Sequence, residues 1–190
     1  MIRDLVIKNR SYRRFDQSVK IDSDIIKSWI ELARFSASGK NMQSLKYIVC
    51  TSEDVVNDIF PTLGWAGYLT DWNGPEEGER PVAYIAMIHD KNIDQNYFCD
   101  DGIASQSILL GAVEDGYGGC IFGTYNRSKV AKIIGLPENM SILWLIALGK
   151  PVEEVVLEDV KNKDIKYWRD EKQVHHVPKR SLEEIVLKDL

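Results

Sequence analysis

Cysteine is scarce in this 190-residue chain, and the spacing of its three cysteines matches no disulfide or metal-binding motif. Cys50, Cys99 and Cys120 are odd in number, lie far apart and form no CxxC pair. This spacing fits a reducing, intracellular compartment best, so we expect a cytoplasmic protein.

Long apolar runs and an excess of positive charge are also absent. No apolar run approaches the length of a membrane span. The first ten residues contain Asp4 and lack the apolar core of a signal peptide. The formal net charge is -5. An acidic balance argues against general binding to nucleic acid or to an anionic membrane, because both select a basic face.

What is present is an ordinary globular composition, with 44% hydrophobic and 28% charged residues. The length suits one domain over residues 1–190. Hydrophobic periodicity and turn residues predict a mixed α and β order with one sheet. Helices are expected at 2–8, 22–36, 53–60, 100–117, 127–135 and 181–190, and strands at 45–51, 82–89, 118–125 and 141–149.

Several helix ends carry recognisable signals. Asp22 and Ser23 are candidate caps for the second helix, and Gly135 is the expected stop of the fifth. Ser181 and Glu184 have the spacing of a capping box before the last helix.

Two central elements have a predicted environment. The apolar face of the helix at 100–117 includes Ile103, Leu110 and Val113. The strand at 141–149 is apolar enough to lie in the centre of a sheet.

Two segments show no regular pattern. Residues 64–81 contain four glycines, two prolines and two tryptophans, which indicates a long loop or lid. Residues 152–175 are charged and have no clear core pattern. We therefore treat residues 152–190 as a C-terminal extension of the domain.

Two glycine-containing stretches superficially resemble nucleotide-binding motifs, and both fail. "SASGKNMQS" lacks a phosphate-loop pattern, because Arg34 stands where its first glycine belongs and Asn41 follows Lys40. "GYGGCIFG" has Ile121 in place of the third glycine of a dinucleotide fingerprint, and it precedes a strand instead of following one.

The histidines and Cys120 each allow two interpretations. His175 and His176 could be metal ligands, but adjacent side chains diverge and no acidic or Cys partner is clearly placed. We therefore expect solvent exposure and no metal site. His89, at a strand end, is expected to be structural. Cys120 could approach a ligand, although a buried, inert thiol is the favoured interpretation.

A cationic cluster in "NRSYRRFD" stands out in an acidic chain. In extended backbone Ser11 and Arg13 share one side, whereas Arg10 and Arg14 share the other. Ser11 and Arg13 could grip one phosphate, with Arg10 reaching in from the end of the first helix. The competing interpretation is a solvated patch, or arginines paired with carboxylates.

A second basic pair favours the phosphate hypothesis. Lys179 and Arg180 directly precede the last predicted helix, and a dianionic phosphate is held by more than one cation. These two side chains could converge with Arg13.

Taken in order, five segments resemble the nitroreductase-like family of FMN-dependent oxidoreductases. "NRSYRRF" resembles the segment of that family that binds the FMN phosphate and ribityl chain. "SASGKNMQSLKYIV" resembles its P-S-x-x-N-x-Q-P-W segment. "GIASQSILLGAVEDGYGGCIFG" resembles its long central helix, which has an inward Gln, and the Gly-rich turn that follows. "LIALGKP" and "PKRSLEEIV" resemble its last core strand and its terminal basic element.

The resemblance implies an FMN site. Ser38 and Asn41 would contact the ring, and the amides of Gly118–Cys120 would approach its other edge. Gln43 and Gln106 would either bind the flavin or be hydrogen-bonded interface residues. The implied cofactor-binding set is Arg10, Ser11, Arg13, Ser38, Asn41, Gln43, Gln106, Gly118, Gly119, Cys120, Lys179 and Arg180.

The chain also departs from the family pattern. Asn9 replaces a common basic residue, which places more weight on Arg10 and Arg13. Ala37 replaces a proline, and Ser44–Leu45 replace Pro-Trp.

The resemblance further implies an α+β fold with a mixed or antiparallel sheet flanked by helices. It implies a homodimer with FMN at the interface and a C-terminal arm that crosses to the partner. The implied activity is ping-pong hydride transfer from NAD(P)H to FMN and on to a nitroaromatic, quinone or similar acceptor. The cofactor would carry the chemistry, so no catalytic side chain is expected. Three alternative functions stay open. They are a redox sensor or flavin carrier without fast turnover, a reductive dehalogenase and a flavin-cleaving enzyme.

Overall fold

The computed structural model describes all 190 residues, which form two compact units. The first unit contains residues 1–64 and 75–152, and the second contains residues 65–74 and 153–190. Each unit has its own sheet. The extension expected at 152–190 therefore makes up most of the second unit.

The first unit is built on a five-stranded antiparallel sheet with β5 in its centre. Strands β2 (Leu45–Cys50) and β3 (Ala83–Asp90) lie on one side of β5 (Met140–Pro151). The short strands β1 (Phe15–Asp16) and β4 (Gly118–Phe122) pair with its other edge. The central position predicted for strand 141–149 is confirmed.

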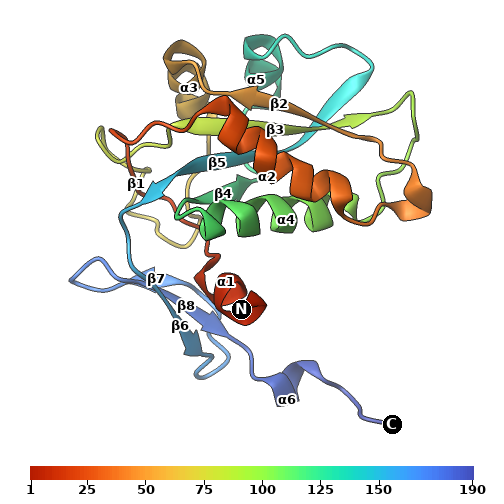
Figure 1. Cartoon of the computed structure of the whole chain (residues 1–190). Coiled ribbons are helices and arrows are strands. Elements are labelled where there is room, and N and C mark those ends of the chain that lie inside the picture. Colours follow the sequence, from red (N-terminus) through yellow and green to blue (C-terminus); the bar gives the residue numbers. More distant parts are fainter. The chain divides into compact units, whose positions relative to one another are not determined.

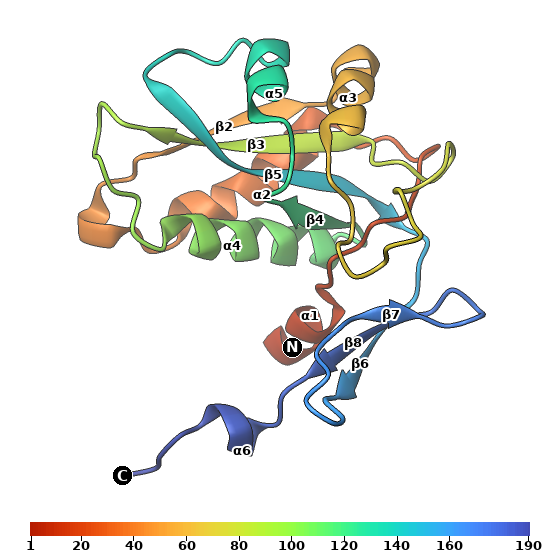
Figure 2. The same cartoon turned by 180° about the vertical axis from the view of Figure 1, so that it is seen from behind.

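Helices cover both faces of this sheet (Figures 1 and 2). Helices α2 (Ser23–Phe35) and α4 (Asp100–Glu114) lie on one face. Helices α3 (Glu53–Ile59) and α5 (Arg127–Ile133) lie on the other. Helix α1 (Ile2–Lys8) contacts α4 and buries none of its own residues. Side chains alternate across the sheet, so both faces need such cover.

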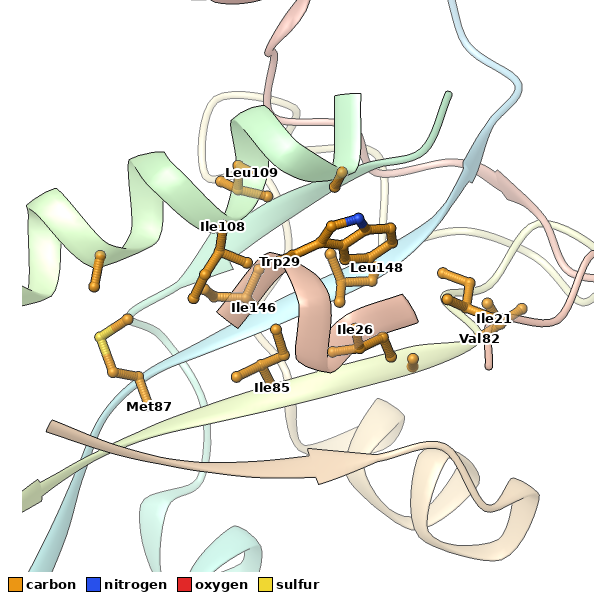
Figure 3. Close-up of a cluster of buried hydrophobic side chains, with 13 residues drawn as sticks. Ile21, Ile26, Trp29, Val82, Ile85, Met87, Ile108, Leu109, Ile146 and Leu148 are labelled. Carbon is orange, nitrogen blue, oxygen red and sulfur yellow. The ribbon is translucent and has the colours of Figure 1, made fainter. Parts of the chain in front are cut away.

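The main hydrophobic core lies between the sheet and the pair α2 and α4 (Figure 3). Trp29 is its largest member, with 1% of its surface exposed. The indole Nε1 donates to Asp115 Oδ2 at 2.7 Å, which satisfies the polar atom of this buried ring. Other members come from both helices and from the strands β3 and β5: Ile26, Ile85, Met87, Ile108, Leu109, Ile146 and Leu148.

The apolar face predicted for α4 is wrong. Ile103, Leu110 and Val113 are only half-buried, whereas the fully buried positions include Ala104, Ile108, Leu109 and Ala112. Apolar side chains occur almost all round this helix, so their periodicity does not select one face. The small residues lie inside because α4 packs closely against α2, where a Cβ on Gly111 would meet Leu32 at 2.6 Å.

The predicted helix ends are mostly confirmed. Asp22 caps α2 by accepting a hydrogen bond from the Asp24 amide. Gly135 follows α5 with φ of 61°, a left-handed conformation that glycine adopts without strain. The last helix, α6 (Leu182–Ile185), is shorter than expected, although Ser181 caps it as predicted.

The second unit contains a three-stranded sheet in a segment for which the sequence showed no core pattern. Strand β8 (His175–Lys179) lies between β6 (Val155–Asp159), which is parallel to it, and β7 (Trp168–Arg169), which is antiparallel. Glu153 and Arg169 form an almost fully buried ion pair at 2.9 Å. Polar and aromatic contacts thus replace the apolar pattern that a sequence search detects.

The expected exposure of the two adjacent histidines is also wrong. His175 is 1% exposed, and the ring of His176 stacks on Trp168 at a centroid distance of 4.0 Å. The reason is that β8 is the middle strand, so both of its edges are paired, and aromatic rings of the preceding segment stack on both histidines.

The loop predicted at 64–81 has no helix or strand. In the second unit, its residues Trp65 and Trp72 pack edge to face. None of the helices is both long and apolar enough to span a bilayer.

Candidate functional site

The N-terminal segment from Asn9 to Arg14 is held in place by contacts at both of its ends and in its middle. Asn9 is buried, and its side-chain amide donates to Gln106 Oε1 on α4 at 3.4 Å. Ser11 forms an isolated parallel bridge with Gly119, and the Tyr12 amide donates to the Gly119 carbonyl at 3.0 Å. These contacts bring together two regions that the sequence analysis had assigned to the same ligand.

Gly118 and Gly119 have a structural reason to be glycine. A Cβ on Gly118 would meet the Tyr12 ring at 2.5 Å, and one on Gly119 would meet the Ala147 carbonyl oxygen at 2.4 Å. Both residues and the following Cys120 are buried. Gly118 therefore allows the N-terminal segment to lie against β4, and Gly119 allows β4 to lie close to β5, whatever the ligand is.

Arg10 lacks the partners that a buried cation normally has. Its guanidinium is half-buried, and Nη2 donates to the Val6 carbonyl at 2.6 Å. Its Nε–H is buried and has no hydrogen-bond partner. Burial lowers the pKa of Arg10 from its ordinary value. A desolvated cation with an unsatisfied donor is a suitable partner for an anionic ligand.

The other two arginines of the cluster differ in their surroundings. Arg13 Nη1 donates to the Ser11 carbonyl at 3.1 Å, so it stays beside the bridge to Gly119. Arg14 forms a two-pronged ion pair with Glu79, at 2.6 and 2.7 Å. The backbone continues this contact, since the Phe15 amide donates to the Glu79 carbonyl. Arg14 thus has the carboxylate partner that the competing interpretation expected.

The segment Ser38–Gln43 forms a tight loop at the start of α4. Ser38 Oγ donates to Asp100 Oδ2 at 2.6 Å and accepts the Gln43 amide at 2.9 Å. The Ser38 hydroxyl is therefore engaged inside the loop. Asn41 and Gln43 are exposed, and Gln43 Nε2 donates to the Asn41 carbonyl at 3.2 Å.

A cavity of about 340 Å³ lies beside this loop, between α2, β2 and α4. Its walls are mainly apolar, and Ser38, Gln43 and Asp100 border it. Burial and the neighbouring Asp100 carboxylate raise the pKa of Tyr47, another lining residue, to about 12. Tyr47 therefore stays neutral well above physiological pH.

The candidate residues of the first unit form two groups, the loop Ser38–Gln43 and the segment Asn9–Arg14 with its neighbour β4. The two groups contact α4 at different places, the loop at Asp100 and the segment at Gln106. Asp100 and Gln106 are six residues apart, which corresponds to about 9 Å along the helix axis and about 120° around it. Gln106 is exposed in this chain instead of facing its interior. Lys179 and Arg180 belong to the second unit, where Arg180 pairs with Glu184 of α6. Their predicted role in phosphate binding stays a prediction.

Three residues that organise the site were missed by sequence reasoning: Asn9, Glu79 and Asp100. In the sequence, Asn9 stands out only as the replacement of a basic residue. Glu79 and Asp100 contact partners more than sixty positions away, so no local spacing indicates them. No group of His, Cys, Asp or Glu side chains in the structure could hold a metal ion.

Comparison with known proteins identifies the family. A model of the Nitroreductase family matches residues 6–67 and 79–150, which is more than half of the chain. The chain belongs to the nitroreductase family. The matched residues include the N-terminal arginine cluster, the Ser38–Gln43 loop and the Gly118–Cys120 strand start. The family and the fold predicted from the five segments are confirmed.

Individual members of the nitroreductase family are distant in sequence. A Bacillus subtilis protein with the provisional name NAD(P)H nitroreductase is 22% identical, over 76% of this chain and 86% of its own length. The structure of a provisionally named nitroreductase from Exiguobacterium sibiricum, in complex with FMN, is 20% identical with a TM-score of 0.70, covering 89% of this chain and 97% of that one. The NADPH:FMN oxidoreductase of Vibrio harveyi, complexed with NAD+, is 22% identical with a TM-score of 0.62, covering 79% and 68%.

We predict that Arg14→Ala lowers the free energy of unfolding by about 1–3 kcal/mol, because it leaves the Glu79 carboxylate without its two-pronged partner. Urea denaturation followed by circular dichroism measures this. The matched control is Arg34→Ala, whose ion pair with Glu31 is more exposed and should contribute less than about 1 kcal/mol. Equal losses in the two variants would contradict the structural role of Arg14.

Proposed function

We propose that this member of the nitroreductase family is an FMN-dependent NAD(P)H oxidoreductase. The observation that carries the proposal is the Arg10 guanidinium, which is half-buried and has an unsatisfied donor beside the bridge between Ser11 and Gly119. A local cluster of cations in an otherwise acidic chain suits a bound anion, and the phosphate at the end of FMN is such an anion. The FMN complex of the Exiguobacterium protein supports this choice.

The residues present fit the cofactor at its phosphate end. Arg10 and Arg13 would supply charge-assisted hydrogen bonds, and the Ser11 hydroxyl would add another donor. Lys179 and Arg180 would complete the charge. The proposed contacts to the ring come from Asn41 and Gln43, whose loop Ser38 holds through its hydroxyl, from Gln106, and from the amides of Gly118, Gly119 and Cys120.

When bound, FMN supplies hydride transfer from NAD(P)H to its N5 atom and on, in ping-pong order, to an acceptor such as a nitroaromatic or a quinone. The side chains bind the cofactor, orient its ring and limit the access of water. No acid–base pair is needed for these tasks. The relatives named for NAD(P)H or NADPH, and the one complexed with NAD+, support a nicotinamide donor.

The first test is reduction of the bound flavin. We predict that protein loaded with FMN loses its visible flavin absorbance within seconds when it is mixed with NADH or NADPH without oxygen. Stopped-flow absorbance measures the rate. A flavin that stays oxidised with both nucleotides would identify a carrier or sensor and overturn the enzyme assignment.

The second test concerns the phosphate. Arg10→Ala and Arg13→Ala should each weaken FMN binding roughly ten- to a hundred-fold, because each removes a charge-assisted hydrogen bond of about 1.5–3 kcal/mol. Riboflavin lacks the phosphate, so its affinity should be similar for these variants and the wild type. Flavin fluorescence titration measures both ligands. Arg14→Ala is the control, since its guanidinium is already paired with Glu79. A larger effect of Arg14→Ala than of Arg10→Ala would show that the phosphate lies elsewhere.

The third test concerns assembly. Apolar side chains lie exposed along α1, where Ile2, Val6 and Ile7 are 67%, 42% and 51% exposed. The two groups of candidate residues contact α4 on different sides, and a second copy offers a way for both groups to face one ligand. We propose a homodimer to which the C-terminal extension contributes. Light scattering should give twice the 21.7 kDa of one chain at micromolar concentration. Val6→Asp should shift the mass toward the monomer, and a wild-type monomer with FMN bound would contradict the proposal.

A further inference from the structure

The loop before β2 adopts a backbone that most side chains avoid. Lys40, Asn41 and Gln43 have φ of 51°, 56° and 53°, in the left-handed region. A non-glycine residue is uncommon there, and three within four positions require that the surrounding structure fixes them. The loop therefore depends on contacts outside itself.

Asp100 makes the central contact. It is the first residue of α4 and only 4% exposed. One carboxylate oxygen accepts the Ser38 hydroxyl at 2.6 Å, and the other accepts the Gly39 amide at 2.8 Å. Ser38 Oγ in turn accepts the Gln43 amide at 2.9 Å. A chain of hydrogen bonds thus runs from Asp100 through Ser38 to the far end of the loop.

The turn that leads into α4 also supplies an apolar wall for the loop, the ring of Phe98. A Cβ on Gly39 would lie 2.5 Å from Phe98 Cδ2, so the backbone packs directly on this ring. Lys40 Nζ lies over the same ring, 5.6 Å from its centre. Asp100 also lies in the first turn of α4, where the positive end of the helix dipole favours a carboxylate.

We propose that Asp100 is a positioning residue, which holds the left-handed loop so that Asn41 and Gln43 face the flavin ring. The proposal rests on the proposed function as far as the flavin is concerned. Asp100 itself is buried beneath the loop, and its effect on the cofactor passes through Ser38 and the loop backbone.

The test compares three variants. Asp100→Ala removes both acceptors, whereas Asp100→Asn can still accept from Gly39 with Oδ1 and donate to Ser38 Oγ with Nδ2. Ser107→Ala is the matched control, because it removes a 2.7 Å hydrogen bond between α4 and Ser36 without touching the left-handed segment. Hydrogen exchange of residues 38–43 is measured without FMN, and FMN affinity and the visible circular dichroism of bound flavin are measured with it.

In Asp100→Ala, the amide hydrogens of Gly39 and Gln43 should exchange roughly tenfold faster than in the wild type. This variant should also bind FMN roughly tenfold more weakly, and the circular dichroism of its bound flavin should differ. Asp100→Asn should stay within about threefold of the wild type in all of these, and so should Ser107→Ala. The proposal is overturned if Asp100→Ala matches Ser107→Ala in exchange and FMN binding, or if Asp100→Asn does not restore them.

The exchange measurement also separates two failures. If wild-type protein binds no FMN, the proposed function fails. In that case the exchange of the loop amides still decides whether Asp100 holds the loop.

Discussion

The candidate site depends first on the contact between the N-terminal segment and the beginning of β4. Ser11 and Gly119 lie side by side because Gly118 has no side chain that would collide with the Tyr12 ring, while Gly119 has none that would collide with the Ala147 carbonyl of β5. This bridge fixes the basic N-terminal segment beside β4, so its side chains hold defined positions on the surface of the first unit. Mobile, solvated cations contribute little to stability or binding, and the bridge, together with the contacts of Asn9 and Arg14, keeps Arg10 and Arg13 from being such cations.

Helix α4 serves as the second organising element, because each group of candidate residues is attached to a different part of it. Asp100, at its first turn, holds the Ser38–Gln43 loop, and Gln106 accepts the Asn9 amide. The same helix packs against α2 through the buried core (Figure 3). The core thereby fixes the position of α4, and α4 holds both groups, so packing in the core controls the geometry of the candidate site.

Much of the fold could be predicted because it is encoded locally. The apolar stretch at 141–149 predicted the central strand, and Asp22 and Gly135 marked helix ends. Features that depend on distant partners could not be predicted in this way. The half-buried ring of His176 needs the neighbouring strands of its sheet, and the role of Asp100 needs a loop more than sixty positions away. The family segments assigned the N-terminal arginines and Gly118–Gly119 to one predicted ligand, and the bridge from Ser11 to Gly119 makes these two segments neighbours. The inward direction of the Ser38 hydroxyl, in contrast, follows only from the Asp100 carboxylate.

The arginines show how surroundings, and not residue type, decide function. Arg14 and Arg10 are four positions apart and chemically identical, yet Arg14 has a carboxylate fork and Arg10 has one carbonyl and an unsatisfied donor. Burial penalises both cations, and in Arg14 the ion pair with Glu79 compensates this penalty. In Arg10 no carboxylate of the chain compensates the desolvation penalty, in keeping with the lowered pKa of this residue. An anion should therefore bind more favourably to Arg10 than to a fully solvated arginine. Part of the cost of removing water from the guanidinium has already been met on folding.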